Sequence, residues 1–344
     1  MNRYGNQPNR TEDSIMKTMQ GLFIRCLAAT LALGTSMLAF SQAAFAWEPK
    51  KPVDFVIMAG KGGGADRMAR LMQSVIEKND FASKPFIPIN KPGGSGAEAL
   101  LHLKNAKGIA ADHTVMVTLN SFYTTPMRQK NLGIDPLSFT PVGRMAEDTF
   151  LLWVHKDSGI TNIEDFVKAA KAEGRDWIMA GTGKGQEDQL LTDFLNGAYG
   201  LQMKYVPFKG GGRVAKELAG KHAHSTVNNP SEQLGFYEAG TTMPIASFTP
   251  ERLPMFQEAP TFKELGKNFV YFMQRSVVGP QAMSDEAEEY YRGVFKKVYD
   301  SPEWQKYMTD KSLQGEFITG DELIAYWTDN NGRHETILKA IGEI

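Results

Sequence analysis

The sequence predicts an α/β protein of two lobes, each a mostly parallel sheet with helices on its faces. The length of 344 residues favours two lobes over one, because a single core rarely organises so long a chain. Short apolar runs alternate with amphipathic stretches, which is typical of parallel βαβ units, and this alternation starts again after His155. No low-complexity linker separates the halves, so we expect strands to cross between the lobes.

The charge balance excludes one class of partner. With 38 Lys+Arg against 39 Asp+Glu, the chain lacks the basic excess of a nucleic-acid-binding domain, and we expect no nucleic-acid partner. Hydrophobic residues make up 42% of the chain, which is enough apolar surface to offset the entropy cost of folding. The composition therefore indicates a globular protein.

The first 46 residues have the layout of a secretory signal peptide. Lys17 and Arg25 precede the apolar run 26–40, and Ala44-Phe45-Ala46 provides a cleavage site after Ala46. The run is short for a bilayer span, although an N-terminal membrane anchor stays an alternative. Cleavage would remove Cys26, the only cysteine, so the exported chain can form no disulfide, thiolate nucleophile or cysteine-based metal site.

In the first half, three apolar runs each lead into a turn and a helical pattern. The predicted strands are 53–58, 86–89 and 114–118. The first is followed by small residues and then by a helical apolar spacing from Met68 to Ile76. The second leads through Lys91-Pro92-Gly93-Gly94-Ser95-Gly96 into a helix around Leu100, and the third into Asn120-Ser121.

The second half repeats this order. Thr161 and Glu164 predict a capping box that opens a helix. Strands are predicted at 177–180, 205–208 and 225–227, with a helical face from Leu190 to Ala198 and helices after Arg213 and Pro230. The runs 150–155 and 271–278 are the expected crossing strands.

The C-terminal tail is predicted to be helical. Ser284 and Ser301 have the pattern of helix N-caps, and Pro302 suits the first position of the helix after Ser301. We expect helices near 285–299, 302–310 and 321–341.

Enzyme motifs are incomplete throughout. No Gly-Lys pair continues as a phosphate-binding loop, and Gly93 to Ala97 lacks the last glycine of a nucleophile elbow. His222 and His224 have no third metal ligand at a familiar spacing. We therefore expect no catalysis, no metal and no cofactor. An exported hydrolase or transferase that uses Ser95, Ser121 or His113 stays the alternative.

Strand-to-helix turns rich in glycine are the most frequent chemical feature. The first amides of a helix are unpaired and lie at its positive end, and glycine lets an anion approach them. In an α/β sheet such turns gather in the crevice beyond the strand ends. The candidate turns are 60–66, 120–125, 181–187, 209–212 and 228–231, with Lys61, Lys184, Lys209 and Arg275 in or near them.

Each turn also has a purely structural interpretation. Gly62-Gly63-Gly64 can serve tight packing, Asp66 can stabilise the first turn of its helix, and Asn228-Asn229 can be turn residues. Lys184 can be solvated, and a buried Arg275 needs either a ligand carboxylate or a protein acid. Their number at one topological position favours an anion site.

From Trp47 to the C-terminus the chain resembles the substrate-binding proteins of the tripartite tricarboxylate transporter family, the Bug-type periplasmic receptors. The matching segments occur in the family's order: 52–70, Asn90 to Gly96, Asn120-Ser121, Gly181-Thr182-Gly183, Tyr205 to Gly210, and Pro260 to Glu264. Glu187-Asp188 and Asn228-Asn229-Pro230 resemble the branch associated with tricarboxylates. Ala59-Gly60-Lys61 departs from the family, which usually has prolines there, and Lys61 either contacts a second carboxylate or points to water.

The resemblance implies a periplasmic "flytrap" receptor that closes on a small di- or tricarboxylate, with the turns 59–66 and 181–184 gripping one carboxylate. It implies delivery to inner-membrane permease subunits, with docking onto a membrane sensor as the alternative, and we expect a monomer. The expected lobes are 47–149 with 273–344, and 150–272. The expected ligand contacts are Ala59, Gly60, Lys61, Gly62, Gly63, Gly64, Asp66, Asn120, Ser121, Tyr123, Gly181, Thr182, Gly183, Lys184, Lys209, Asn228, Asn229 and Arg275.

Overall fold

The structure is a computed structural model that describes Met1 and residues 47–344. The predicted signal peptide falls on 1–46 and so lies, apart from Met1, outside the described residues. Glu48–Ile344 form one compact unit, which contains both predicted lobes. Across the described residues, no helix combines the length and the apolar character that a membrane crossing requires.

The first sheet has five strands in the order β2-β1-β3-β10-β4. Their bounds are Val53–Ile57 for β1, Phe86–Asn90 for β2, Thr114–Val117 for β3, Thr140–Thr149 for β4 and Phe272–Gly279 for β10. β1 pairs in parallel with β2 and β3, whereas β10 is antiparallel to both β3 and β4. Only β10 therefore runs against the others, and the sheet is mostly parallel as predicted.

The second sheet repeats this layout in the order β7-β6-β8-β5-β9. The bounds are Leu151–His155 for β5, Ile178–Thr182 for β6, Lys204–Phe208 for β7, Ser225–Asn228 for β8 and Thr242–Ser247 for β9. β6 is parallel to β7 and β8, and β5 is antiparallel to β8 and β9. β6, β7 and β8 thus correspond to β1, β2 and β3. We call the first sheet with its helices lobe 1, and the second sheet with its helices lobe 2.

The chain crosses between the sheets at two places that lie side by side. β4 ends at Thr149 and β5 begins at Leu151, so Phe150 alone separates the two sheets at the first crossing. Phe248 donates its backbone N–H to the Phe150 carbonyl at 3.0 Å, and Tyr271, just before β10, donates to the Phe248 carbonyl at 2.9 Å. Both runs that were predicted to cross therefore begin at the crossings, at Phe150 and Tyr271, although β5 and β10 each lie within one sheet.

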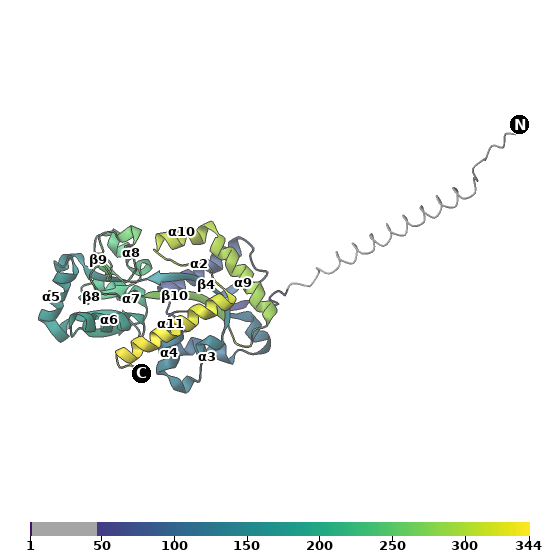
Figure 1. Cartoon of the computed structure of the whole chain (residues 1–344), viewed down its shortest axis with the longest axis horizontal. Helices are drawn as coiled ribbons and strands as arrows, with labels where there is room; N and C mark the ends of the chain where they lie inside the picture. The colour runs from purple at the N-terminus through teal and green to yellow at the C-terminus, as the bar shows by residue number, and fades with distance from the viewer. Residues whose placement is uncertain (2–46) are drawn as a thin grey trace. The chain divides into compact units, whose positions relative to one another are not determined.

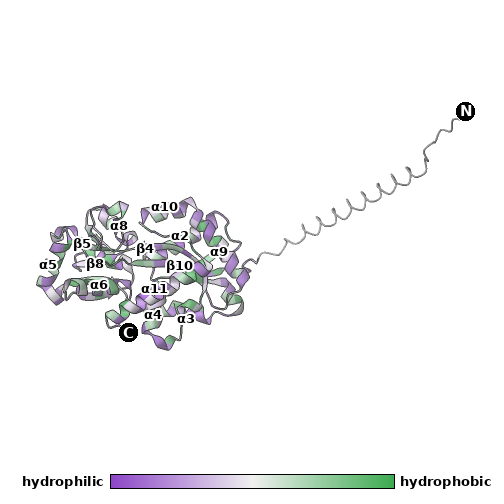
Figure 2. Ribbon diagram, viewed as in Figure 1, coloured by the Kyte–Doolittle hydropathy of each residue, from purple (hydrophilic) through white to green (hydrophobic). Residues whose placement is uncertain are grey.

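Helices cover both sheets (Figure 1). In lobe 1 these are α2 (Gly64–Lys78), α3 (Ala97–Asn105), α4 (Ser121–Arg128), α9 (Asp285–Asp300), α10 (Pro302–Asp310) and α11 (Gly320–Ala340). In lobe 2 they are α5 (Ile163–Glu173), α6 (Glu187–Tyr199), α7 (Gly211–Ala219) and α8 (Pro230–Glu238). Helices such as α9 and α10 carry both hydrophilic and hydrophobic residues, because one face meets water and the other packs inward (Figure 2).

Aromatic rings fill the interface between the first sheet and α9. Phe55 of β1 and Phe86 of β2 are fully buried and meet edge to face, with ring centroids 5.7 Å apart. Phe295 of α9 packs on both rings at 5.8 and 5.9 Å. This cluster fixes α9 on β1 and β2, the strands whose C-terminal ends lead to the site.

Most predicted elements are present within one or two residues of their expected bounds. The caps Ser284 and Ser301 are confirmed, since each side chain accepts a backbone N–H of its helix. The capping box at Thr161 is wrong by one residue, because Asn162 accepts the N–H of Asp165 at 2.8 Å. β4 and β9 were missed: polar and charged residues interrupt the apolar pattern of β4, and Pro244 interrupts that of β9.

Candidate functional site

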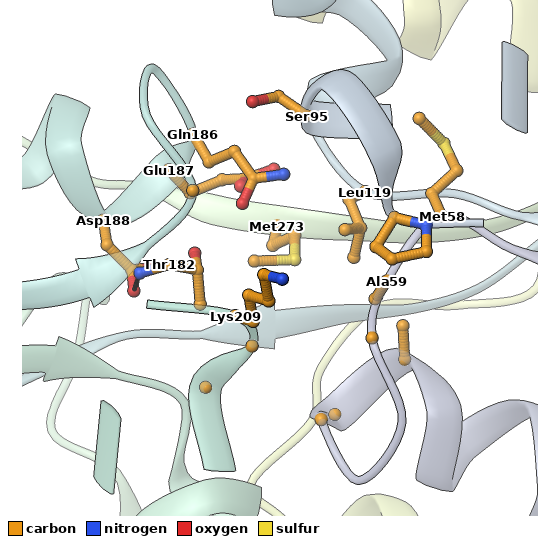
Figure 3. Close-up of a pocket in the computed structure, with 18 of the residues that line it drawn as sticks. Met58, Ala59, Ser95, Leu119, Thr182, Gln186, Glu187, Asp188, Lys209 and Met273 are labelled. Atoms are coloured by element: carbon orange, nitrogen blue, oxygen red, sulfur yellow. Dashed lines mark hydrogen bonds between the residues drawn. The ribbon is translucent and has the colours of Figure 1, made fainter. Parts of the chain in front are cut away.

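A cavity of about 540 Å³ lies where the strand-to-helix turns of the two lobes face each other. In Figure 3, Gln186 and Glu187 extend from lobe 2 toward Met273 at the centre, and Met58 and Leu119 face them from lobe 1. The volume is in the range that small-molecule sites occupy. Ten of the predicted contacts line it: Ala59, Gly60, Lys61, Gly63, Gly64, Thr182, Gly183, Lys209, Asn229 and Arg275.

The turn between β1 and α2 forms one wall. Gly62 has a φ of +80°, a left-handed conformation that favours glycine, and its N–H donates to Asp66 Oδ2 at 2.9 Å. Gly63 is the N-cap of α2 and supplies no side-chain cap. The amide at the start of α2 is instead satisfied from lobe 2, since Gly64 N donates to Glu232 Oε1 at 3.1 Å.

At two further turns a backbone N–H is also bonded to a carboxylate, once within lobe 2 and once between the lobes. The N–H of Thr182, at the end of β6, donates to Asp188 Oδ2 at 2.8 Å. The N–H of Ser121, at the start of α4, donates to Glu187 Oε1 at 3.0 Å. One amide at each of these three turns is therefore already bonded to a carboxylate of the chain and is not free. Buried amides need acceptors, and in this structure Glu187, Asp188 and Glu232 of the chain itself supply them.

Burial shifts the pKa of two of these acids. It raises the pKa of Glu187, and it raises that of Asp188 well above the usual range, because a carboxylate loses hydration in the interior. The nearby Glu232 charge raises the pKa of Asp188 further.

Arg275 forms a buried ion pair at the base of the cavity. Its Nε and Nη2 donate to Asp148 Oδ2 at 3.1 and 2.5 Å, and both side chains are almost fully buried. The sequence left two possible partners for Arg275, a ligand carboxylate or a protein acid, and in this structure the partner is a protein acid, Asp148. Nη1 nevertheless has no hydrogen-bond partner among the described residues. Burial raises the pKa of Asp148 to about 6, against the opposing effect of Arg275.

Lys61 and Lys209 add positive charge at the cavity wall. Both are exposed, and within residues 47–344 neither forms an ion pair. An anionic group that entered the cavity would therefore meet two cations not already committed to a protein carboxylate.

Eight predicted contacts lie outside the cavity lining: Gly62, Asp66, Asn120, Ser121, Tyr123, Gly181, Lys184 and Asn228. Asn120 is buried and bonds to the crossing segment, donating to the Phe272 carbonyl at 2.7 Å and accepting the Gln274 N–H at 3.0 Å. Asn228 holds Glu232 by donating to its Oε2 at 2.8 Å. These two asparagines support the walls of the cavity.

The remaining members of this group have structural contacts as well. Tyr123 is fully buried, with its ring stacked on that of His334. Burial alone would raise the pKa of Asp66, but hydrogen bonds from Arg70, Gly62 and Asn90 outweigh it and lower that pKa. Lys184 is exposed, and its carbonyl accepts the Ser95 hydroxyl of lobe 1 at 3.0 Å.

Several lining residues were not predicted as contacts: Met58, Pro92, Gly93, Gly94, Ser95, Leu119, Gln186, Glu187, Asp188, Phe208, Glu232 and Met273 are among them. The segment 92–95 lay in a glycine-rich turn that could have been included by analogy with 209–212. Nothing in the sequence indicated that Glu232 lines the cavity, because an acid in the first turn of a helix is common.

Of the residues of the hydrolase alternative, Ser95 and His113 have other partners, whereas the buried Ser121 hydroxyl has no hydrogen-bond partner among the described residues. The Ser95 hydroxyl donates to the Lys184 carbonyl, and the two ring nitrogens of His113 bond to backbone atoms of Lys50 and Ile109. In the part of the chain that the structure describes, no group of three His, Cys, Asp or Glu side chains could hold a metal ion.

Comparisons with known proteins agree with this architecture. Residues 68–343 match the tripartite tricarboxylate transporter family receptor model. A Cupriavidus necator protein, "UPF0065 protein in gbd 5'region", is 24% identical, with 92% of this chain and 94% of that protein aligned.

Two solved structures from Rhodopseudomonas palustris have the same fold. One, solved with adipate, has a TM-score of 0.78 at 23% identity and covers 86% of this chain and 98% of that one. The other is MatC with bound malate, with a TM-score of 0.76 at 20% identity and coverage of 84% and 99%. With the family model matching most of its length, the chain belongs to the tripartite tricarboxylate transporter receptor family.

Proposed function

We propose that this chain is a periplasmic receptor that binds a small organic di- or tricarboxylate between its lobes and delivers it to a tripartite tricarboxylate permease. The observation that carries the proposal is the convergence of equivalent turns, those after β1 and β6, on one cavity. Lys61, Lys209 and Arg275 line that cavity, so an anion would gain charge-assisted hydrogen bonds there.

The relatives support a carboxylate as the ligand class. Adipate and malate, the molecules in the two Rhodopseudomonas palustris structures, are both dicarboxylates of a size that a cavity of about 540 Å³ accommodates. The predicted signal peptide supports export to the periplasm. Membership of the receptor family supports a role in binding over one in catalysis.

We propose that ligand exchange requires the lobes to part by a hinge at the crossings near Phe150 and Tyr271. The proposed lobes are 47–149 with 273–344, and 150–272. Cross-lobe hydrogen bonds such as Ser95 to Lys184 would break on opening. A monomer is proposed, because each chain supplies both walls of its own cavity. Docking onto a membrane sensor stays the alternative to delivery to a permease.

Calorimetry on the exported form tests the proposal. Succinate, malate, adipate and citrate are titrated, with succinamide as an uncharged control, and micromolar affinity for at least one acid is expected. Lys209→Met should weaken that affinity about tenfold or more, since it removes a charge-assisted contact. Lys216→Met, at an exposed position of α7, is the matched control. No heat with any acid, or equal loss in both variants, would refute the proposal.

A further inference from the structure

Glu232 holds a position suited to a carboxylate from outside the chain. Its Oε1 accepts the Gly64 N–H at the start of α2, and its Oε2 accepts the Asn228 side-chain N–H at 2.8 Å. Among the described residues no cationic side chain forms an ion pair with it. A side-chain anion from lobe 2 is thus bound at a helix N-terminus of lobe 1, in a place that attracts anions generally.

Glycines from both lobes make room for this carboxylate. A Cβ atom at Gly211, the first residue of α7, would overlap the carboxylate of Glu232. A Cβ at Gly63 would lie 3.8 Å from Glu232 Oε1 and 3.9 Å from Gly211 N. The carboxylate therefore lies between the N-terminal ends of α2 and α7, in a cradle that a larger side chain would fill.

Two buried donors beside the cradle are unused. The hydroxyl of Ser231 and Nη1 of Arg275 have no partner among the described residues, although the two residues are only 5% and 1% exposed. Both side chains border the start of α2: a Cβ at Gly64 would lie 3.3 Å from Ser231 Oγ and 3.0 Å from Arg275 Nη2. Buried donors without acceptors are rare and costly, so the cradle can satisfy more acceptor oxygens than Glu232 supplies.

We propose that Glu232 is an internal competitor: its carboxylate occupies the cradle in the empty receptor, and a carboxylate of the ligand must displace it to bind. The inference rests on the proposed function. Because Glu232 must leave the cradle first, the binding free energy of every acid is less favourable by the free energy that Glu232 gains there. This competition also favours acids with a second anchoring group, because a weak monocarboxylate cannot meet that cost.

The test compares dissociation constants for malate, adipate and succinate in wild type, Glu232→Ala and Glu232→Gln. Removing the competitor should tighten binding about tenfold or more in Glu232→Ala, in line with the strength of hydrogen bonds to a charged group. Glu232→Gln keeps the shape and a neutral acceptor, so a smaller gain is expected. Glu238→Ala removes the same charge from an exposed end of the same helix and should leave affinity unchanged.

The outcomes separate the two proposals. Tighter binding in the order Ala, Gln, wild type supports the internal competitor, since a merely structural role for Glu232 would weaken binding on substitution. If wild type binds an acid and Glu232→Ala binds it no more tightly, the inference is overturned while the proposed function stands. If neither wild type nor any folded variant binds an acid, both are overturned. Far-ultraviolet circular dichroism verifies that each variant is folded.

Discussion

Glu187 and Ser121 join the two lobes directly: Oε1 of Glu187, in the first turn of α6, accepts the backbone N–H of Ser121, the first residue of α4, at 3.0 Å. The same arrangement, a carboxylate of lobe 2 on a helix start of lobe 1, recurs with Glu232 and Gly64. Arg67, in the first turn of α2, adds a third bond from lobe 1 to lobe 2 by donating to the Ser231 carbonyl. Two helix N-termini of lobe 1 therefore take part in holding it to lobe 2.

Substitution of Glu187 tests this connection. Glu187→Ala leaves the buried Ser121 amide without its acceptor and should lower the free energy of unfolding by about 1–3 kcal/mol. Glu187→Gln keeps an acceptor and should cost clearly less, because burial already disfavours the charged form by raising the pKa of Glu187. Urea unfolding of both variants gives the comparison. Equal losses would mean that the charge, and not the hydrogen bond, matters.

Removing only one partner of the buried pair Arg275 and Asp148 should strongly destabilise the protein. Arg275→Met leaves an uncompensated buried carboxylate and is expected to lower the free energy of unfolding by about 3–5 kcal/mol. The double variant Arg275→Met/Asp148→Leu removes both charges and should recover much of that loss. The denaturant midpoints of the single and double variants measure this recovery. A double variant as unstable as the single one contradicts the expectation.

Asp148 should make stability depend on pH in an unusual direction. Its pKa is raised from 3.8 to about 6 in the folded chain, so between these values the folded state binds more protons than the unfolded state. Its contribution to the free energy of unfolding therefore falls as pH rises from about 4 to about 6, by about 1–3 kcal/mol.

Urea unfolding at pH 4.5 and pH 7 measures this effect against Asp148→Asn, which cannot titrate. The stability of wild type relative to the variant should be greater at pH 4.5 than at pH 7. Subtracting the variant removes the contributions of all other acids, such as Asp66, whose lowered pKa acts in the opposite direction. A difference that does not change with pH would show that Asp148 keeps its ordinary pKa.

Two glycines of lobe 2 should respond oppositely to substitution by alanine. Gly185 has a φ of +71°, and a Cβ there would overlap the Arg128 guanidinium that reaches across from lobe 1. Gly185→Ala should therefore lose about 1–2 kcal/mol of stability. Gly197 lies within α6 with open space around it, so Gly197→Ala should gain about 0.5–1 kcal/mol. Thermal melts of the two variants provide the measurement, and shifts of the same sign would contradict the prediction.

The turns of the site were predictable because they follow from local patterns. An apolar run, small residues and an amphipathic stretch place Ala59 to Gly64 after a strand, and the same order places Thr182 and Gly183. Parallel strands bring such turns to one edge of a sheet. The strand β4 escaped prediction since Arg144, Glu147 and Asp148 give it a polar sequence, and the partner that buries Asp148, Arg275, lies far away in the chain.

Local sequence was enough to predict most strands and helices of the two lobes and the glycine turns, because each depends on residues close together in the chain. What satisfies the amides of those turns depends on the packing of one lobe against the other. The acceptor of Gly64 is Glu232, 168 residues away, and that of Ser121 is Glu187, 66 residues away. No local pattern links such partners, since the sequence presents the donors and the acids but only the folded lobes bring them within bonding distance.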